Sequence, residues 1–227
     1  AFRDGEAGSR HNPEFSLLEW YRTDYDHHQL MVETAELVMH CLGPRPVEYF
    51  SYRELFLQQL SIDPFTSSTA ELRARACEEI DVGIVSGDRD LWLDLMMTHL
   101  IEPCFRDRGL CFVYDYPASQ AALSRIVEVD GLQLAQRFEL YADGIELANG
   151  YCELMDAAEQ RRRFVADNTR RREFGLAERG LDEYLLAAME AGLPACAGVA
   201  LGVDRLLMLA TGAGDIREVL AFDWQRS

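Results

Sequence analysis

The spacing of apolar residues changes along the chain, and each spacing predicts a different kind of element. Alternation over residues 15–21 is typical of a strand, so residues 1–25 are expected to form two strands around a polar loop. Residues 26–42 instead carry apolar side chains at helical spacing and are followed by Gly43-Pro44. This segment is therefore predicted to be a helix that ends before residue 43.

Three more helices are expected in the next part of the chain. They cover residues 51–60, 68–80 and 88–101, and each begins near a serine or aspartate that can cap a helix. Because they lie between two strand regions, we interpret residues 51–105 as a helical insertion.

Strand patterns return in the second half, at residues 111–116 and 134–141. Asp143-Gly144 is a strong hairpin turn and predicts a return strand at 145–151. Helices at 155–174 and 181–191, a strand at 196–203 and a helix from residue 204 complete the pattern. Together these elements predict one α+β domain over residues 1–227, built on an antiparallel sheet flanked by helices.

Composition excludes several classes of protein. With 48% hydrophobic residues among 227, the chain can bury a substantial core and is not a disordered protein. Its apolar runs are short and broken by charge, so no membrane span is expected. The six cysteines lack metal-binding spacing and are expected to be reduced, mostly buried thiols. With no secretory leader visible, these features predict a cytoplasmic protein.

The net charge of −17 bears on possible partners. Nucleic-acid affinity depends largely on neutralising phosphates, and an acidic surface repels them. The charge therefore makes tRNA an unfavoured partner, although local basic patches remain possible.

The predicted hairpin brings two carboxylates together. A two-residue loop at Asp143-Gly144 places Tyr141 opposite Glu146, and Glu139 then lies diagonally on the same face, about 7–8 Å away at Cβ. Two such carboxylates can converge on Mg²⁺ and its waters. The alternative is a pair of solvated glutamates on an exposed sheet face.

Two polar residues follow in the return strand. A regular strand would send Asn149 and Glu153 to the face opposite Glu146. For all three to share a site, a bulge near Gly150 is needed, and glycine in a strand often marks one.

The N-terminal loop and the last helix each supply an arginine. Arg3 enters the loop, and Phe15 and Glu19 lie on the returning strand, which suits a nucleotide beside an amine-bearing ligand. The alternative is a surface hairpin with incidental charge. Arg205 lies in the first helical turn, where a cation opposes the helix dipole unless an anion is nearby. The alternative there is an ion pair with Asp204 or another acid.

Taken in order, these segments resemble the motifs of class II aminoacyl-tRNA synthetases. Phe2-Arg3 resembles the start of motif 2 and residues 198–209 resemble motif 3. The sequences His11-Asn-Pro-Glu-Phe15 and Glu19-Trp-Tyr21 are similar to the lysyl-tRNA synthetase version of motif 2. Residues 116–120, 146–150 and 198–205 are more similar still to a paralogous branch, the elongation factor P–(R)-β-lysine ligases.

The resemblance implies roles for individual residues. Arg3 would hold the α-phosphate of ATP and Arg205 the γ-phosphate, so both would be catalytic, while Glu139 and Glu146 would hold Mg²⁺. The remaining ATP-binding residues would be Glu6, His11, Asn12, Phe15 (against adenine), Leu147 and Gly202, with Glu146 also near the nucleotide. The amino-acid pocket would be lined by Glu19, Tyr21, Asn149, Glu153 and Ala200.

The resemblance also implies an activity: lysine or (R)-β-lysine is activated as an adenylate and transferred to a lysine of elongation factor P. Ala200 stands where lysyl-tRNA synthetases have glycine, which favours β-lysine. The alternatives are a lysyl-tRNA synthetase catalytic domain, or a non-catalytic regulatory subunit. Gly5 supports the last alternative, because the family has glutamate there. The family's motif 1 and main dimer contact are expected to precede Ala1, so the full-length protein is expected to be a homodimer.

Overall fold

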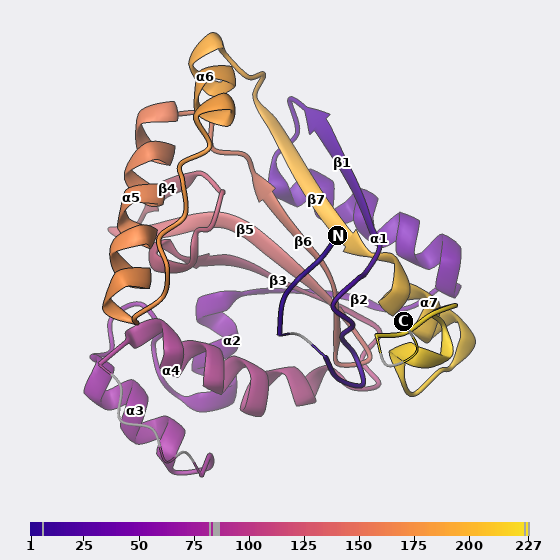
Figure 1. Cartoon of the computed structure of the whole chain (residues 1–227). Coiled ribbons are helices and arrows are strands. Elements are labelled where there is room, and N and C mark those ends of the chain that lie inside the picture. Colours follow the sequence, from indigo (N-terminus) through magenta and orange to yellow (C-terminus); the bar gives the residue numbers. More distant parts are fainter. Residues whose placement is uncertain (6, 82, 84–86, 225, 227) are drawn as a thin grey trace.

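A seven-stranded sheet forms the centre of the protein (Figure 1). The computed structural model describes the whole chain except residues 6, 82, 84–86, 225 and 227. Six strands follow the order β1-β7-β6-β5-β3-β2, and β4 pairs with β5 outside this path. The strands are β1 (Leu17–Thr23), β2 (Val47–Ser51), β3 (Leu110–Pro117), β4 (Ile126–Val129), β5 (Leu132–Ala142), β6 (Ile145–Cys152) and β7 (Cys196–Gly202).

The α+β class is confirmed, but the sheet is mixed rather than antiparallel throughout. β2 pairs with β3 in parallel, and the other pairings are antiparallel. Strands β2 and β4 are not among the predicted elements, because they have only five and four residues and so carry little periodic signal.

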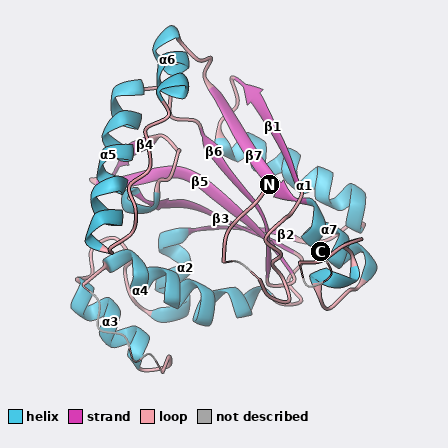
Figure 2. Ribbon diagram, viewed as in Figure 1, coloured by secondary structure: helices cyan, strands magenta, loops and turns pink. Residues whose placement is uncertain are grey.

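Helices cover both faces of the sheet (Figure 2). Helix α1 packs with α7 over β5, β6 and β7 on one face, and the helices between β2 and β3 cover part of the other. The helices are α1 (His27–Leu42), α2 (Tyr52–Leu60), α3 (Thr69–Cys77), α4 (Arg89–Met96), α5 (Ala157–Glu173), α6 (Glu183–Ala191) and α7 (Val203–Thr211). Most begin or end within three residues of the predicted bounds; beyond α4, residues 97–101 continue as a π-helical turn.

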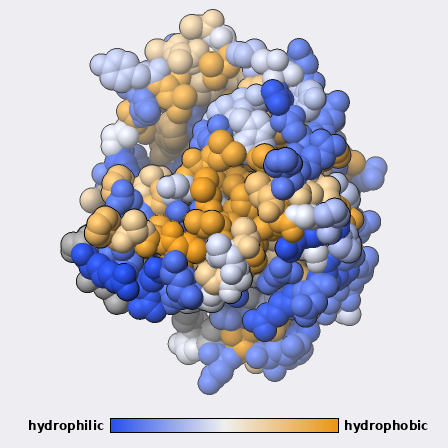
Figure 3. All heavy atoms as spheres, turned by 90° about the vertical axis from the view of Figure 1, so that its right-hand side faces the viewer, coloured by the Kyte–Doolittle hydropathy of each residue, from blue (hydrophilic) through white to orange (hydrophobic). Residues whose placement is uncertain are grey.

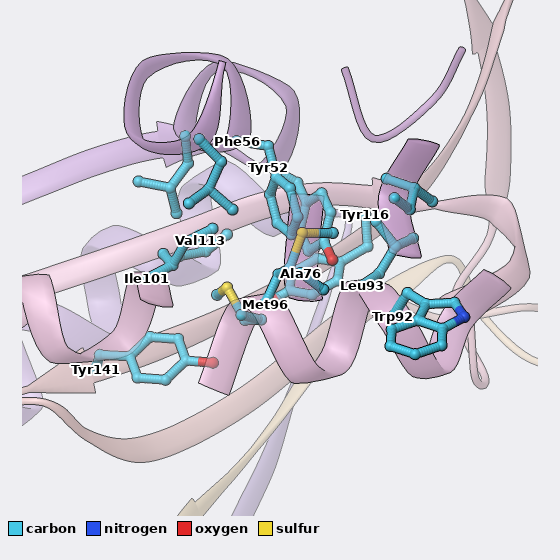
Figure 4. Packing of buried hydrophobic residues seen from close by; sticks show 14 of the residues in the cluster. Tyr52, Phe56, Ala76, Trp92, Leu93, Met96, Ile101, Val113, Tyr116 and Tyr141 are labelled. Carbon is cyan, nitrogen blue, oxygen red and sulfur yellow. The ribbon is translucent and has the colours of Figure 1, made fainter. Parts of the chain in front are cut away.

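Two hydrophobic cores lie on opposite sides of the sheet. The first packs α2, α3 and α4 against β3 and β5, and includes Tyr52, Phe56, Trp92 and Tyr141 (Figure 4). The second packs α1 against β3, β5, β6 and β7. Since the first core covers only the β2–β3–β5 side of its face, the β6–β7–β1 side of that face remains available to a ligand.

The N-terminal segment differs from its prediction. Of the two strands expected in residues 1–25, only β1 forms; the earlier one is reduced to an isolated bridge between Phe2 and Glu14. Two backbone hydrogen bonds flank it, from Arg3 N to Pro13 O (2.9 Å) and from Phe15 N to Ala1 O (3.0 Å). The segment is therefore a polar loop closed on itself beside the sheet.

The cysteines also differ in part from their prediction. All six are free thiols, but Cys41, Cys77 and Cys104 are exposed, so most are not buried. The three lie on α1, on α3 and in the turn that follows the π-helical segment, where one helical side faces solvent. Across the described residues, no helix is long and apolar enough to cross a membrane.

Candidate active site

A row of directly paired residues crosses the open side of the sheet. Glu19 on β1 pairs with Ala200 on β7, which pairs with Asn149 on β6, and Asn149 pairs with Glu139 on β5. Residues opposite one another in a sheet point to the same face. The register therefore brings four of the predicted site residues, from four strands, onto one surface.

A bulge adds Glu146 to this surface. The Asp143-Gly144 turn forms as predicted, with positive φ at both residues, and Tyr141 pairs with Glu146. Leu140 then pairs with Ala148, which leaves Leu147 as the extra residue. The predicted bulge thus exists at Leu147 rather than near Gly150, and it turns Glu146 and Asn149 to the same face.

Glu139 is held by three donors and is not a solvated surface residue. Its Oε2 accepts hydrogen bonds from Tyr116 Oη (2.7 Å) and Tyr141 Oη (2.5 Å). Arg137 forms an ion pair with Oε1 and also stacks its guanidinium on the Tyr116 ring, 4.6 Å from the centroid. A buried carboxylate needs such partners, and these fix its position. The alternative of two solvated glutamates is therefore wrong for Glu139.

Glu146 is the more available of the two hairpin carboxylates. It is half-buried, and its Oε2 lies 3.4 Å from Arg205 Nη1. Burial, together with the negative charge of Glu139, raises the pKa of Glu146 to about 7. Since a nearby cation would favour the charged form, this surplus of negative charge fits a divalent ion between the two carboxylates.

Arg205 joins the last helix to the N-terminal loop. Its Nη1 donates to the Glu146 backbone oxygen (2.8 Å), and its Nη2 lies 2.6 Å from His11 Nε2. Asp204 is not its partner, because that buried carboxylate accepts a hydrogen bond from Ser16 N (2.8 Å). The predicted alternative of an ion pair with Asp204 or another acid is therefore wrong for Asp204 but right for another acid, because the acidic partner of Arg205 is Glu146.

A cavity of about 210 Å³ lies between the N-terminal loop, the bulge and the start of α7. Arg3 lies at its edge with the guanidinium 5.3 Å from the centroid of the Phe15 ring. Its lining includes the predicted nucleotide residues Arg3, His11, Asn12, Phe15, Glu146, Leu147, Gly202 and Arg205, and also Asn149 and Ala200. Glu6 lies outside the described residues.

A larger open groove, about 690 Å³, is lined by residues of α4, α5 and the segment before α6, and by none of the predicted site residues.

Some lining residues build the loop. Asn12 donates to the Glu14 backbone oxygen (2.7 Å) and accepts from Trp224 N (3.1 Å), so both ends of its amide have protein partners. Arg10 donates to the Gly144 backbone oxygen (3.0 Å), which ties the loop to the hairpin turn. These contacts position the loop over the sheet.

Glu19, Tyr21 and Glu153 do not line this cavity; beside it on the same sheet face they form an open acidic group with little positive charge (the amine pocket). Tyr21 Oη donates a hydrogen bond to Glu19, and this bond and burial raise the pKa of Tyr21. Burial and the charge of Glu19 raise the pKa of Glu153 to about 7. Within the described part of the chain, Glu19 and Glu153 form no ion pair. The pocket is thus suited to a cationic ligand.

Gly198 makes this pocket possible. It pairs with both Tyr21 and Tyr151, and a Cβ at its position would overlap Glu153 Oε1 and the Tyr21 ring. Only a residue without a side chain leaves both groups where they are.

The residues that support the site are not among those predicted from the sequence. Arg137, Tyr116 and Tyr141 hold Glu139, and Gly198 opens the amine pocket. Arg137 could have been found, because it lies two residues before Glu139 and so shares its face. Tyr116 could not, since its place depends on the irregularity between Tyr114 and Tyr116 in β3.

Comparison with known proteins agrees with this arrangement. The profile of the family described as "tRNA synthetases class II (D, K and N)" matches residues 1–226. The chain is 48% identical to a protein of Pseudoalteromonas translucida named "Elongation factor P--(R)-beta-lysine ligase", over 100% of this chain and 70% of that protein. Proteins of the same name from Mannheimia succiniciproducens (48% identity, 97% of this chain and 68% of that one) and Salmonella typhi (46%, 100% and 70%) are similarly close. This chain belongs to the class II tRNA synthetase family, in the branch of the elongation factor P–(R)-β-lysine ligases.

Proposed function

We propose that this protein uses ATP to activate (R)-β-lysine, or lysine, as an adenylate and transfers it to a lysine side chain of elongation factor P. The observation that carries the proposal is the pair Glu19 and Glu153, which lacks an arginine partner within the described residues and adjoins the arginine-lined cavity. Such a site accepts an amine next to a polyphosphate. The names of the relatives supply the acceptor protein.

Adenylate formation follows from the two halves of the site. The substrate carboxylate attacks the α-phosphorus of ATP, forms a P–O bond, and displaces pyrophosphate. Arg3 and Arg205 contribute positive charge at the phosphoryl oxygens, and Phe15 provides an aromatic face for adenine. Glu139 and Glu146 would hold Mg²⁺, which neutralises phosphate charge when bound.

The amine pocket orients the substrate for this attack. Glu19 and Glu153 would pair with the amino groups of the substrate. These positive groups would offset the negative charge of Glu19, which contributes to the raised pKa of Glu153. Asn149 and Ala200 lie between this pocket and the cavity, where the reacting carboxylate must be. Positioning then supplies much of the rate, and no covalent enzyme nucleophile is needed.

Transfer is the second step of the proposal. The uncharged ε-amine of the acceptor lysine attacks the carbonyl of the adenylate, an amide bond forms, and AMP leaves. The acceptor loses a proton in the process. The acceptor side chain must reach the boundary between the cavity and the amine pocket, near Ala200.

The proposal includes a homodimer that works in the cytoplasm, where ATP and translation factors are present. Apolar side chains gather on the side of the molecule formed by β1, α1 and α7 (Figure 3). Leu18, Val32 and Leu207 are exposed on these elements. Such a surface supports pairing with a second copy.

The first experiment is ATP–pyrophosphate exchange by the full-length protein, with α-lysine and (R)-β-lysine compared. Faster exchange with β-lysine, followed by labelling of purified elongation factor P, is the expected result. Faster exchange with α-lysine and charging of tRNA would favour a lysyl-tRNA synthetase. No exchange with either would favour a non-catalytic subunit, in line with Gly5.

A further inference from the structure

Two histidines and an aspartate form a cluster on the sheet face opposite the candidate active site. His27, His28 and Asp115 each direct one potential ligand atom into a common space, and these atoms all lie within 4.8 Å of one another. His27 and His28 open α1, which packs on the second core, and Asp115 belongs to β3. The proposed function uses none of the three.

Local structure brings these side chains together. Asp26 caps α1 by accepting a hydrogen bond from Gln29 N (2.8 Å), so the two histidines occupy the first turn. Asp115 lies at the irregularity of β3 and has a φ of 58°, in the left-handed region. A non-glycine residue in that region is held there by its surroundings, and such conformations cluster at functional sites.

The contacts of His27 fix the orientation of its ring. The ring is almost completely buried, with Nε2 2.9 Å from Asp115 Oδ1 and Nδ1 3.7 Å from Cys152 Sγ. Burial lowers the pKa of His27, but the contacts with Asp115 and Cys152 outweigh it and raise the pKa to about 9. The 2.9 Å contact between Nε2 and Oδ1 is a hydrogen bond, so without an ion a proton lies between these two atoms.

The ion pair between His27 and Asp115 does not account for the presence of a second histidine, His28, in the cluster. Its ring centroid lies 4.1 Å from that of His27 and 4.9 Å from that of Tyr114, against which it packs edge-on. Burial and the charge of His27 lower its pKa. A second imidazole beside a buried His–Asp pair is a typical zinc ligand set.

We propose that His27 Nε2, one ring nitrogen of His28 and the Asp115 carboxylate bind a single divalent transition-metal ion, with Zn²⁺ the best fit. Two imidazoles and one carboxylate match its preferred ligands, and water completes a four-coordinate site. The metal replaces the proton on His27 Nε2, while Nδ1 donates to Cys152 as an outer partner that sets the ring orientation. The positive end of the α1 dipole opposes the ion, and Asp26 and Asp115 offset it.

Such an ion would join three elements of the fold, one of which, β6, reaches the substrate pocket. It would tie the start of α1 to β3, and through Cys152 to the end of β6, one residue before Glu153. The site is therefore placed to stabilise the pocket from behind without contacting a substrate.

The test is a Zn²⁺ titration of the metal-stripped full-length protein by calorimetry. Replacement of His28 by Gln removes one ligand but leaves the His27–Asp115 pair, so we expect Zn²⁺ affinity to fall at least about 10-fold. His40→Gln, an exposed histidine near the other end of the same helix, is the matched control and should stay within about twofold of the wild type. Equal affinity in the wild type and both variants, or no saturable binding, would overturn the proposal.

Co²⁺ provides the second measurement, because the exposed cysteines could also bind metal. The proposed ligands contain no thiolate, so the Co²⁺ form should show visible d–d bands without thiolate-to-metal charge transfer. A strong charge-transfer band that disappears when Cys41, Cys77 and Cys104 are replaced by serine would assign the metal to those thiols and reject the site.

Discussion

The two pairs of carboxylates on the open sheet face differ in what surrounds them. Glu139 is enclosed by Arg137 and two tyrosine hydroxyls, and Glu146 contacts Arg205. Glu19 and Glu153 have Tyr21 nearby and, among the described residues, no cationic partner. Glu139 is thus neutralised by the protein itself, whereas Glu19 and Glu153 keep their charge for a ligand.

The difference in surroundings gives the carboxylate side chain two purposes, one in the framework of the protein and one in binding a ligand. A carboxylate enclosed by permanent donors is a fixed part of the framework, and its removal leaves other buried charges unpaired. A carboxylate whose pKa is raised is a cost to folding that an incoming cation removes. Substitutions of Glu139 and of Glu153 should therefore change stability in opposite directions.

The largest effect is expected from Glu139→Gln. The substitution leaves Arg137 buried without its charge partner, and breaking a buried pair in this way costs about 3–5 kcal/mol of unfolding free energy. Urea denaturation monitored by circular dichroism measures it. Glu128→Gln, on the exposed strand β4, is the control and should change stability by less than about 0.5 kcal/mol.

A double variant sharpens this result. Replacing Arg137 by Met in the Glu139→Gln background removes the orphaned charge and should recover part of the lost stability. If the double variant is less stable than Glu139→Gln, the pair is not what makes the position sensitive, and the contrast between the two carboxylate pairs fails.

Arg205→Ala comes next. Loss of a charged donor aimed at developing charge lowers rates by roughly 100- to 1,000-fold, so ATP–pyrophosphate exchange should fall by that factor. The half-buried Glu146 would also lose its cation. Arg217→Ala, an exposed arginine outside the cavity, should leave exchange unchanged. An equal loss in both variants would point to a general effect of surface charge.

Glu153→Gln should act in the opposite direction on stability. The folded-state pKa of about 7 lies above the usual value near 4.5, so the folded state loses stability as pH rises between these values. The amide carries no such cost, and the variant should be more stable than the wild type by about 1–3 kcal/mol at pH 8, with the gain vanishing near pH 4. Thermal unfolding at several pH values measures this.

The same variant should bind substrate less well. A lost charged contact to an amine should raise the KM for β-lysine by roughly 10-fold or more while the KM for ATP stays constant. A variant that is destabilised at pH 8, or whose KM values for both substrates rise together, would contradict an open amine pocket.

Part of the candidate site could be predicted from local sequence patterns. The Asp143-Gly144 turn fixed the register of the hairpin, and hence the pairing of Tyr141 with Glu146. Alternation fixed the shared face of Glu19 and Tyr21. Both are local rules, which act over a few residues and need no tertiary information.

The rest depends on long-range packing. The positions of the bulge at Leu147 and of the irregularity at Asp115 depend on pairing with the neighbouring strands. No local sequence pattern predicts these positions. Gly198 is essential because Tyr21 and Glu153 converge on it from two other strands. The cluster of His27, His28 and Asp115 likewise requires the start of α1 to meet the end of β3, which single-sequence periodicity does not encode.

The smallest effect is expected from Ala200→Gly, which tests the boundary between the two halves of the site. Ala200 lies between Glu19 and Asn149 in the cross-strand row, so its methyl group limits where the substrate backbone can lie. Removing one methyl group changes the difference in transition-state binding free energy between β-lysine and α-lysine by about 1 kcal/mol or slightly more. The ratio of kcat/KM for β-lysine over α-lysine should therefore fall roughly 5- to 10-fold. Ala197→Gly, on the opposite face of the same strand, has a similar backbone cost but does not reach the pocket, and should lower Tm without changing the ratio. An unchanged ratio in Ala200→Gly, or an equal shift in Ala197→Gly, would mean that selectivity comes from Glu19 and Glu153 rather than from the shape of the boundary between them and the nucleotide.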